Sequence, residues 1–211
     1  MTLTEAVNAC LRGIGLRPVA RFDDPNLNAA VALEVIESVS REIQSTGWWF
    51  NEEGSWFLTP DSNGEVRVPN NALDITAWNG SRDKSLTIRG TTIYNTITHS
   101  TDLRDIVNAD GKIELRMIFE LPFEPLPPIA QVAISDKAVR KFAQDIDGDV
   151  NKWRFNTEDE KRSMALLYSA ESANTKRNAM QNPVVQNFLA RAGGVNSLSS
   201  SSIFPEKWRQ Q

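Results

Sequence analysis

The spacing of the apolar residues changes twice along this chain, from helical to strand-like and back to helical. In the first and last parts of the chain, apolar residues recur every three or four positions, which is the spacing of one face of an α-helix. In the middle part they form short runs about ten residues apart, separated by turn-forming residues, as in a small antiparallel sheet. A β-rich segment between two pairs of helices predicts an α+β fold.

Two helices are predicted in the first part of the chain. Thr2 and Glu5 have the spacing of a capping box, and the apolar stripe that follows them stops near Gly13. The second helix is predicted to open at residues 23–25, where two acidic residues and a proline suit a first turn, and to end at Gly47. The two stripes consist of Leu3, Ala6, Val7, Cys10, Leu11 and Ile14, and of Ala32, Val35, Ile36, Val39 and Ile43.

Short β-type runs fill the middle of the chain. The predicted strands are residues 48–50, 55–58, 65–68, 75–78, 86–89, 91–94 and 113–120, with turns at residues 51–54 and 60–64. Three tryptophans, Trp48, Trp49 and Trp56, cluster where the helices give way to these strands. We expect most of them to lie in the core of the β-rich segment, because their large apolar rings favour burial.

Two more helices are predicted after the proline-rich residues 122–128, because proline is accepted at the start of a helix and not in its interior. Gly148 ends the third helix. The fourth is predicted to start at a capping box formed by Thr157 and Glu160 and to run to about residue 181. Its apolar stripe is narrow, so a neighbouring subunit is expected to complete its packing. The predicted buried residues are Val132, Val139, Phe142, Ala143 and Ile146 in the third helix, and Met164, Leu167 and Tyr168 in the fourth.

The simplest arrangement joins the helical pairs into one four-helix-type bundle that carries a small antiparallel β-rich insertion and an extended C-terminal tail. The predicted parts are residues 1–47 and 122–182 for the bundle, 48–121 for the insertion and 183–211 for the tail. The tail is rich in serine but contains three large apolar residues, Ile203, Phe204 and Trp208. These side chains are either anchors that dock on a partner or incidental residues of an unstructured end.

Charge and composition exclude several classes of function. The net charge is −4, and no stretch has the clustered Lys and Arg of a protein that clamps nucleic acid. No run of about 18 apolar residues predicts a membrane span, and the N-terminus lacks the pattern of a secretory signal. His99 is the single histidine and Cys10 the single cysteine, so neither a zinc site nor an intramolecular disulfide is predicted. We expect Cys10 to be buried and His99, which lies in a polar run, to face solvent.

Two short motifs resemble functional sites. Residues 145–149 carry acids at the first, third and fifth positions of a calcium loop, but Val150 stands where the loop needs glycine and Asn156 where it needs glutamate. A turn that ends a helix is the better interpretation. Glu52 and Glu53 are a carboxylate pair of the kind that a glycoside hydrolase uses, with a solvated turn as the ordinary alternative. We therefore predict no catalytic residue, cofactor or metal, and keep a carbohydrate-active tail component as the alternative function.

Several stretches share their order with one family. They are Ile14-Gly15 with Pro18-Val19, residues 43–48 with Phe50-Asn51, residues 93–95, the junction at residues 121–127, and residues 138–144. Together they span roughly residues 3–180 and resemble tail tubular protein A, the head-to-tail adaptor of short-tailed phages with podovirus morphology. Residues 43–48 and the proline-rich junction are the most specific of these stretches in combination.

The resemblance implies a structural virion protein rather than an enzyme. It implies that the chain forms a twelve-subunit ring with copies of itself under the portal protein, with the nozzle protein (tail tubular protein B) docked below and tail fibres attached near that junction. DNA would pass through the ring during genome ejection without sequence-specific binding, which suits a chain of net charge −4. The protein would be made in the host cytoplasm and act in the virion tail, with no membrane partner.

Overall fold

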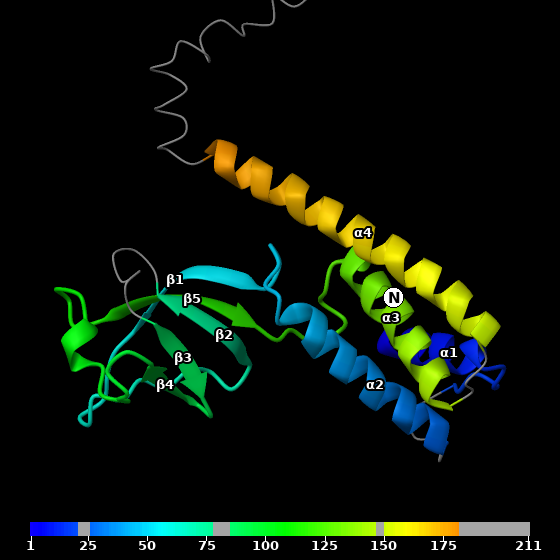
Figure 1. The fold of residues 1–211 in the computed structure, drawn as a ribbon, viewed down its shortest axis with the longest axis horizontal. Helices are drawn as coiled ribbons and strands as arrows, with labels where there is room; N and C mark the ends of the chain where they lie inside the picture. The colour runs from blue at the N-terminus through cyan, green and yellow to red at the C-terminus, as the bar shows by residue number, and fades with distance from the viewer. Residues whose placement is uncertain (21–25, 78–84, 147–149, 182–211) are drawn as a thin grey trace, which may run out of the picture. The chain divides into compact units, whose positions relative to one another are not determined.

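The computed structural model describes residues 1–20, 26–77, 85–146 and 150–181. The chain divides into two compact units, Met1–Leu167 and Tyr168–Gln211. In the described residues, helices flank a series of strands, which confirms the mixed α+β class (Figure 1). In chain order the elements are α1 (Leu3–Gly13), α2 (Leu27–Gln44), β1 (Glu52–Leu58), β2 (Ala72–Ala77), β3 (Leu86–Arg89), β4 (Thr92–Asn95), the 3₁₀ helix η1 (Arg104–Ile106), β5 (Ile113–Phe119), α3 (Pro128–Ile146) and α4 (Val150–Gln181).

The first helix has the predicted capping box. The Glu5 backbone N–H donates to Thr2 Oγ1 at 3.2 Å, and Glu5 Oε2 accepts from the Thr2 backbone N–H at 2.7 Å. The start of the second helix differs from the prediction, because the Asn26 side chain caps it and α2 begins at Leu27. Residues 23–25, the predicted start, lie outside the described residues.

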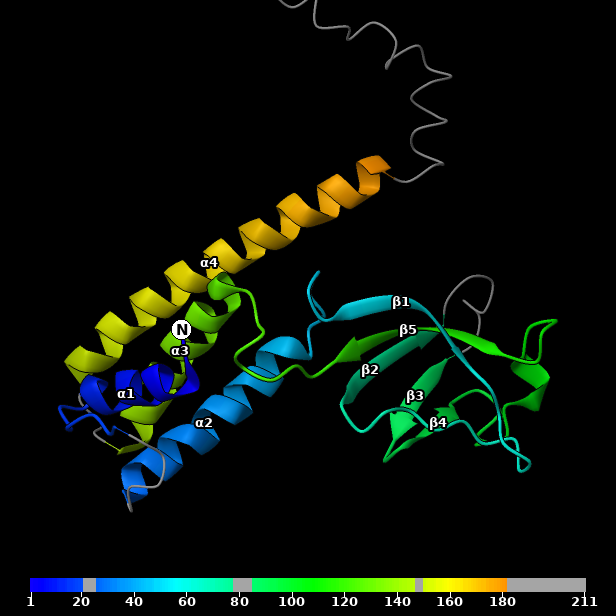
Figure 2. The same ribbon diagram turned by 180° about the vertical axis from the view of Figure 1, so that it is seen from behind.

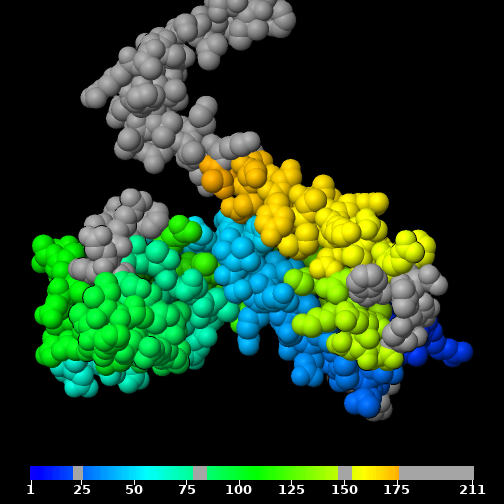
Figure 3. All heavy atoms as spheres, in the orientation of Figure 1, coloured from blue at the N-terminus to red at the C-terminus, as the bar shows by residue number. Residues whose placement is uncertain are grey.

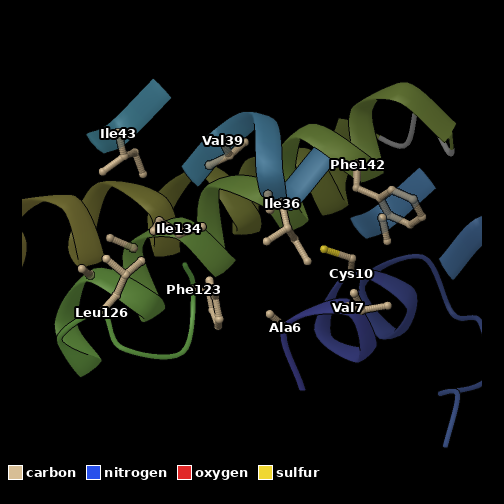
Figure 4. Packing of buried hydrophobic residues seen from close by; sticks show 14 of the residues in the cluster. Ala6, Val7, Cys10, Ile36, Val39, Ile43, Phe123, Leu126, Ile134 and Phe142 are labelled. Carbon is tan, nitrogen blue, oxygen red and sulfur yellow. The ribbon is translucent and has the colours of Figure 1, made fainter. Parts of the chain in front are cut away.

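Helices α1, α2 and α3 pack against one another around one apolar core. Figure 4 shows Cys10 of α1 and Ile36 of α2 turned toward each other, with Phe142 of α3 nearby. All three side chains are almost completely buried, and Leu167 joins the same core from α4. The surface of α2 stays exposed between the β-rich segment and α3 (Figure 3). The predicted stripes of the first two helices are thus confirmed as the core-facing sides.

The predicted core face of the third helix is partly wrong. Phe142 and Ala143 are buried as expected, but Val132 and Ile146 are 40% and 44% exposed. The buried face instead consists of three small residues, Ala130, Ala133 and Ala138, together with the larger Ile134. Alanines allow close approach of neighbouring helices but contribute little to a hydrophobic pattern, so the larger side chains misplace the buried face.

The fourth helix is longer than predicted. It begins at Val150, so Thr157 and Glu160 lie inside the helix rather than at its start. Of the predicted stripe, Leu167 is buried and Met164 packs against the helical core, whereas Tyr168 is 54% exposed. A capping-box spacing inside a continuous helix therefore gave a false start signal, because Thr and Glu also occur in helix interiors.

Two antiparallel sheets form the β-rich segment. The order in the first sheet is β1-β5-β2, and these strands lie side by side in both ribbon views (Figures 1 and 2). The second sheet is the hairpin of β3 and β4. The predicted strand at residues 65–68 forms one isolated bridge, Arg67 with Thr92, and the predicted strand at residues 48–50 is a turn. The turn predicted at residues 51–54 is instead largely part of β1, which bulges between Glu53 and Trp56.

The β-rich segment has its own apolar core. Strand β5 supplies Ile113, Leu115 and Met117, each at most 1% exposed. Residues outside the strands complete the core, namely Val66, Val68, Leu103 and, in η1, Ile106. The tryptophan prediction is wrong for Trp48, which is 2% exposed and belongs to the helical core. The same prediction is wrong for Trp56, because its side chain is 36% exposed on β1.

Candidate functional site

Two buried amides join the helical part to the β-rich segment. The Asn51 side-chain NH₂ donates to the backbone oxygens of Gln44 at 2.9 Å and Phe119 at 2.8 Å, and its Oδ1 accepts from the Trp48 backbone N–H at 2.8 Å. The Gln44 side chain forms a reciprocal pair with the backbone of Leu121, at 2.8 and 3.0 Å. Both amides are at most 1% exposed, so a lost hydrogen bond would leave a buried polar group without a partner.

This junction brings together two of the stretches that carry the family resemblance, residues 43–48 and 121–127. Residues 43–48 end α2, and residues 121–127 lead from β5 into α3, yet Gln44 and Leu121 bond directly across 77 positions of sequence. Sequence reasoning missed the role of Gln44 and Asn51. The available signal for Gln44 was its position directly after Ile43, the last residue of the apolar stripe, where a polar side chain lies close to the buried face of the helix.

A groove of about 560 Å³ opens beside the junction, between α2 and the segments around residues 70–71 and 120–124. Ile36 and Phe123 form part of its apolar lining. At its edge Arg41 Nε bonds Glu120 Oε2 at 3.0 Å, an ion pair that ties α2 to the end of the β-rich segment. Its volume is in the range of about 300–1,000 Å³ that is usual for ligand pockets.

Strand β1 presents apolar side chains on an open sheet edge. It pairs with β5 along one side, and no strand pairs with its other side among the described residues. Phe57 is 50% exposed, and Trp56 rests partly on Phe119 at a ring-centroid distance of 5.3 Å. Ser55 takes a left-handed backbone with φ of 58°, which produces the bulge. Such bulges hinder unwanted strand pairing at an exposed sheet edge.

Charged contacts connect α3 to α2 and to α4. Lys137 on α3 bonds Glu42 on α2 at 2.9 Å and holds the pKa of Glu42 below its ordinary value. Arg140 on α3 pairs with Glu160 on α4. Beside this pair, burial raises the pKa of the Asp136 carboxyl, with smaller contributions from nearby acidic residues on α4 and an opposing hydrogen bond to Ser163.

The candidate catalytic residues do not form a catalytic arrangement. Glu52 bonds Arg116 at 2.6 Å, whereas Glu53 accepts a hydrogen bond from Trp56 Nε1 at 2.9 Å. Adjacent strand residues point to opposite faces, so the two carboxylates do not face each other across a cleft. Cys10 is completely buried and its pKa is raised to about 12 by desolvation, which keeps the thiol protonated.

The remaining sequence candidates do not converge on a common site. His99 lies in an exposed turn with a left-handed φ of 56°. Residues 147–149 of the calcium-like motif lie outside the described residues, as do Ile203, Phe204 and Trp208. Within the described ranges, no group of three His, Cys, Asp or Glu side chains could hold a metal ion. No helix there is both long and apolar enough to cross a membrane.

Comparison with known proteins places this architecture beside phage tail proteins. Residues 4–177 match the family described as tail tubular protein. A curated relative, tail tubular protein A of Klebsiella phage KP34, is 26% identical over 164 residues, which cover 77% of this chain and 83% of that protein. The family match includes the helical flanks and the β-rich segment between them.

Proposed function

The chain belongs to the tail tubular protein family and is a structural component of a phage tail, and on this premise we propose that it is the ring-forming adaptor between the portal and the tail nozzle. The extent of the family match carries the proposal, because residues 4–177 include both the helical part and the β-rich segment. Twelve copies would surround the DNA channel, with the portal protein above, the nozzle protein docked below and tail fibres attached near that junction.

The parts of the chain would divide the contacts between them. The four helices of residues 1–47 and 122–182 would act as one bundle, and residues 48–121 would offer a second binding surface. Helix α4 supports a subunit–subunit contact, because Phe155 and Leu166 are 74% and 54% exposed. They are eleven residues apart, or about three helical turns, and so lie on one side of the helix. A neighbouring subunit that covered them would bury both side chains.

A non-enzymatic role agrees with the state of the acidic candidates. The carboxylates of Glu52 and Glu53 are engaged separately, by Arg116 and by Trp56. The net charge of −4 suits a channel wall that lets DNA slide, because like charges repel. These observations favour the adaptor over a carbohydrate-active tail component.

Assembly with the cognate portal tests the proposal. We expect the purified full chain to be a monomer or weakly associated in light scattering, and to form a twelve-subunit ring when the portal is added. Particle mass and a ring-shaped outline in electron micrographs would record this result. If this chain forms no ring on the portal, the adaptor role is refuted. A stable ring without the portal would refute the proposed order of assembly.

Substitution of the former catalytic candidates separates the adaptor from the enzyme. We expect chains with His99→Ala, Glu52→Ala or Glu53→Ala to assemble into infectious particles. A variant that assembles normally but cannot infect would instead favour a catalytic role for the substituted residue.

A further inference from the structure

The groove beside the junction combines apolar walls with an acidic rim. Leu3 of α1 is partly exposed and contributes apolar surface, and Ile36 of α2 and Phe123 also line the groove although each is at most 6% exposed. Ile36 and Phe123 also belong to the helical core, so the groove opens directly onto packed apolar side chains. Apolar walls of this kind favour a partner that inserts an aliphatic or aromatic side chain.

The rim carries more negative than positive charge. Three carboxylates line the groove, from Glu37, Glu120 and Glu124, against one guanidinium, from Arg41, which leaves a net charge of −2. Arg41 is paired with Glu120. Glu37 and Glu124 are exposed and make no ion pair within the described part of the chain. A partner with two cations would therefore find two carboxylates to pair with.

One segment of this chain has the matching chemistry. Residues 203–209 place the apolar Ile203, Phe204 and Trp208 beside the cationic Lys207 and Arg209. Helix α4 ends at Gln181, and the 22 residues from there to Ile203 can span about 75 Å when extended. This length exceeds twice the diameter of a small domain, which is about 30 Å, so the segment can extend to an adjacent subunit.

We propose that residues 203–209 of one copy bind the groove of the neighbouring copy in the ring. Phe204 and Trp208 fill the apolar part of the groove beside Phe123. Lys207 and Arg209 pair with the two exposed carboxylates, Glu37 and Glu124. In a closed ring every groove has one neighbouring tail, so all copies are satisfied by the same contact. This inference rests on the proposed adaptor function, because it needs copies side by side.

Disulfide trapping between separate chains tests this contact. One full-length variant carries Asn70→Cys in the groove, and a second carries Gln210→Cys in the tail. Mixed in equal amounts and assembled on the portal under mild oxidation, they should give a covalent dimer in a non-reducing gel. Native Cys10 does not compete, since it is buried with a pKa of about 12. The matched control is Asn63→Cys, which places the thiol on an exposed loop away from the groove and should give no dimer.

The outcomes separate this inference from the adaptor function. Rings that form without the covalent dimer overturn the tail contact and leave the adaptor role intact. A third variant carries both cysteines in one chain. If it forms only an intramolecular disulfide, the tail binds its own groove, which also overturns the contact with a neighbour. If no ring forms on the portal, the adaptor function fails and the neighbour contact fails with it.

Charge reversal tests the chemistry of the contact. Glu37→Lys combined with Glu124→Lys should lower the dimer yield by about tenfold, and Lys207→Glu with Arg209→Glu in the partner should restore it. Glu34→Lys is the matched control on the same helix, because Glu34 is exposed but does not line the groove. Phe204→Ala with Trp208→Ala should lower the yield at least as much, since aromatic anchors dominate such contacts. An unchanged yield in the reversed variants would overturn the assignment.

Discussion

The helical part and the β-rich segment each have an apolar core, but the two cores are built differently. Three helices approach closely in the first, with alanines such as Ala133 and Ala138 between them. In the second, one central strand, β5, is covered partly by side chains from outside the strands, including Leu103 and Ile106. Helix packing therefore stabilises one core and turn geometry the other. The buried amides of Gln44 and Asn51 bond across the junction, so we expect them to determine whether the two cores unfold together.

Truncation of one side chain in each core gives the largest expected effect. Phe142→Ala should lower the free energy of unfolding by about 3–5 kcal/mol and Leu115→Ala by about 2–5 kcal/mol, since both side chains are fully buried. Urea unfolding followed by circular dichroism would measure both values. Because the junction couples the cores, each variant should shift one common transition. Two separate transitions in the unsubstituted protein would contradict this coupling.

Removal of the junction amide is expected to have the next largest effect. Asn51→Ala removes three buried hydrogen bonds, to the backbone oxygens of Gln44 and Phe119 and from the Trp48 backbone N–H, so the free energy of unfolding should fall by about 2–3 kcal/mol. The unfolding transition should also broaden or divide. Asn63→Ala, at an exposed loop position, is the control and should change stability by less than about 0.5 kcal/mol. Equal effects of the two variants would show that the amide does not couple the cores.

A pair of glycines tests how far turn geometry stabilises the β-rich segment. Gly64 and Gly90 both have positive φ, of 84° and 65°, so alanine is strained by about 1–2 kcal/mol at either position. At Gly64 a new Cβ would also collide with the side chain of Asp102, which Arg104 holds through a bond of 2.9 Å. Gly90 has open space around it. Thermal unfolding should therefore show a larger loss for Gly64→Ala than for Gly90→Ala, and the reverse order would contradict the explanation.

The smallest expected effect concerns the pH response of the helical part. Because the pKa of Asp136 is raised in the folded state, the folded protein loses stability as pH rises above the ordinary value of 3.8 and through the raised pKa. Asp136→Asn should therefore raise the melting temperature at neutral pH. The difference from the unsubstituted protein should disappear in acid, where the carboxyl is neutral in both states. A gain that persists unchanged at low pH would assign the effect to packing rather than to charge.

Local sequence patterns predicted the positions of the helices and strands better than they predicted which side chains are buried. The capping box of Thr2 and Glu5 is confirmed in detail, since it depends on residues three positions apart. The strands at residues 86–89 and 113–120 are confirmed within one residue. The capping-box spacing of Thr157 and Glu160 was misleading, because the same spacing occurs inside a helix that begins at Val150.

Sequence alone determined the order of the helical and β-rich parts and most of their elements, and also that Cys10 is buried in a helical stripe. Only the tertiary structure decided that Trp48 joins the helical core, that Val132 stays exposed, and that Gln44 bonds the backbone at Leu121. Backbone hydrogen bonding and side-chain spacing act over a few residues, so the local pattern contains them. The burial of a side chain and the partner of a polar group depend on which distant segment of the chain packs against them. The packing of the whole chain determines that segment.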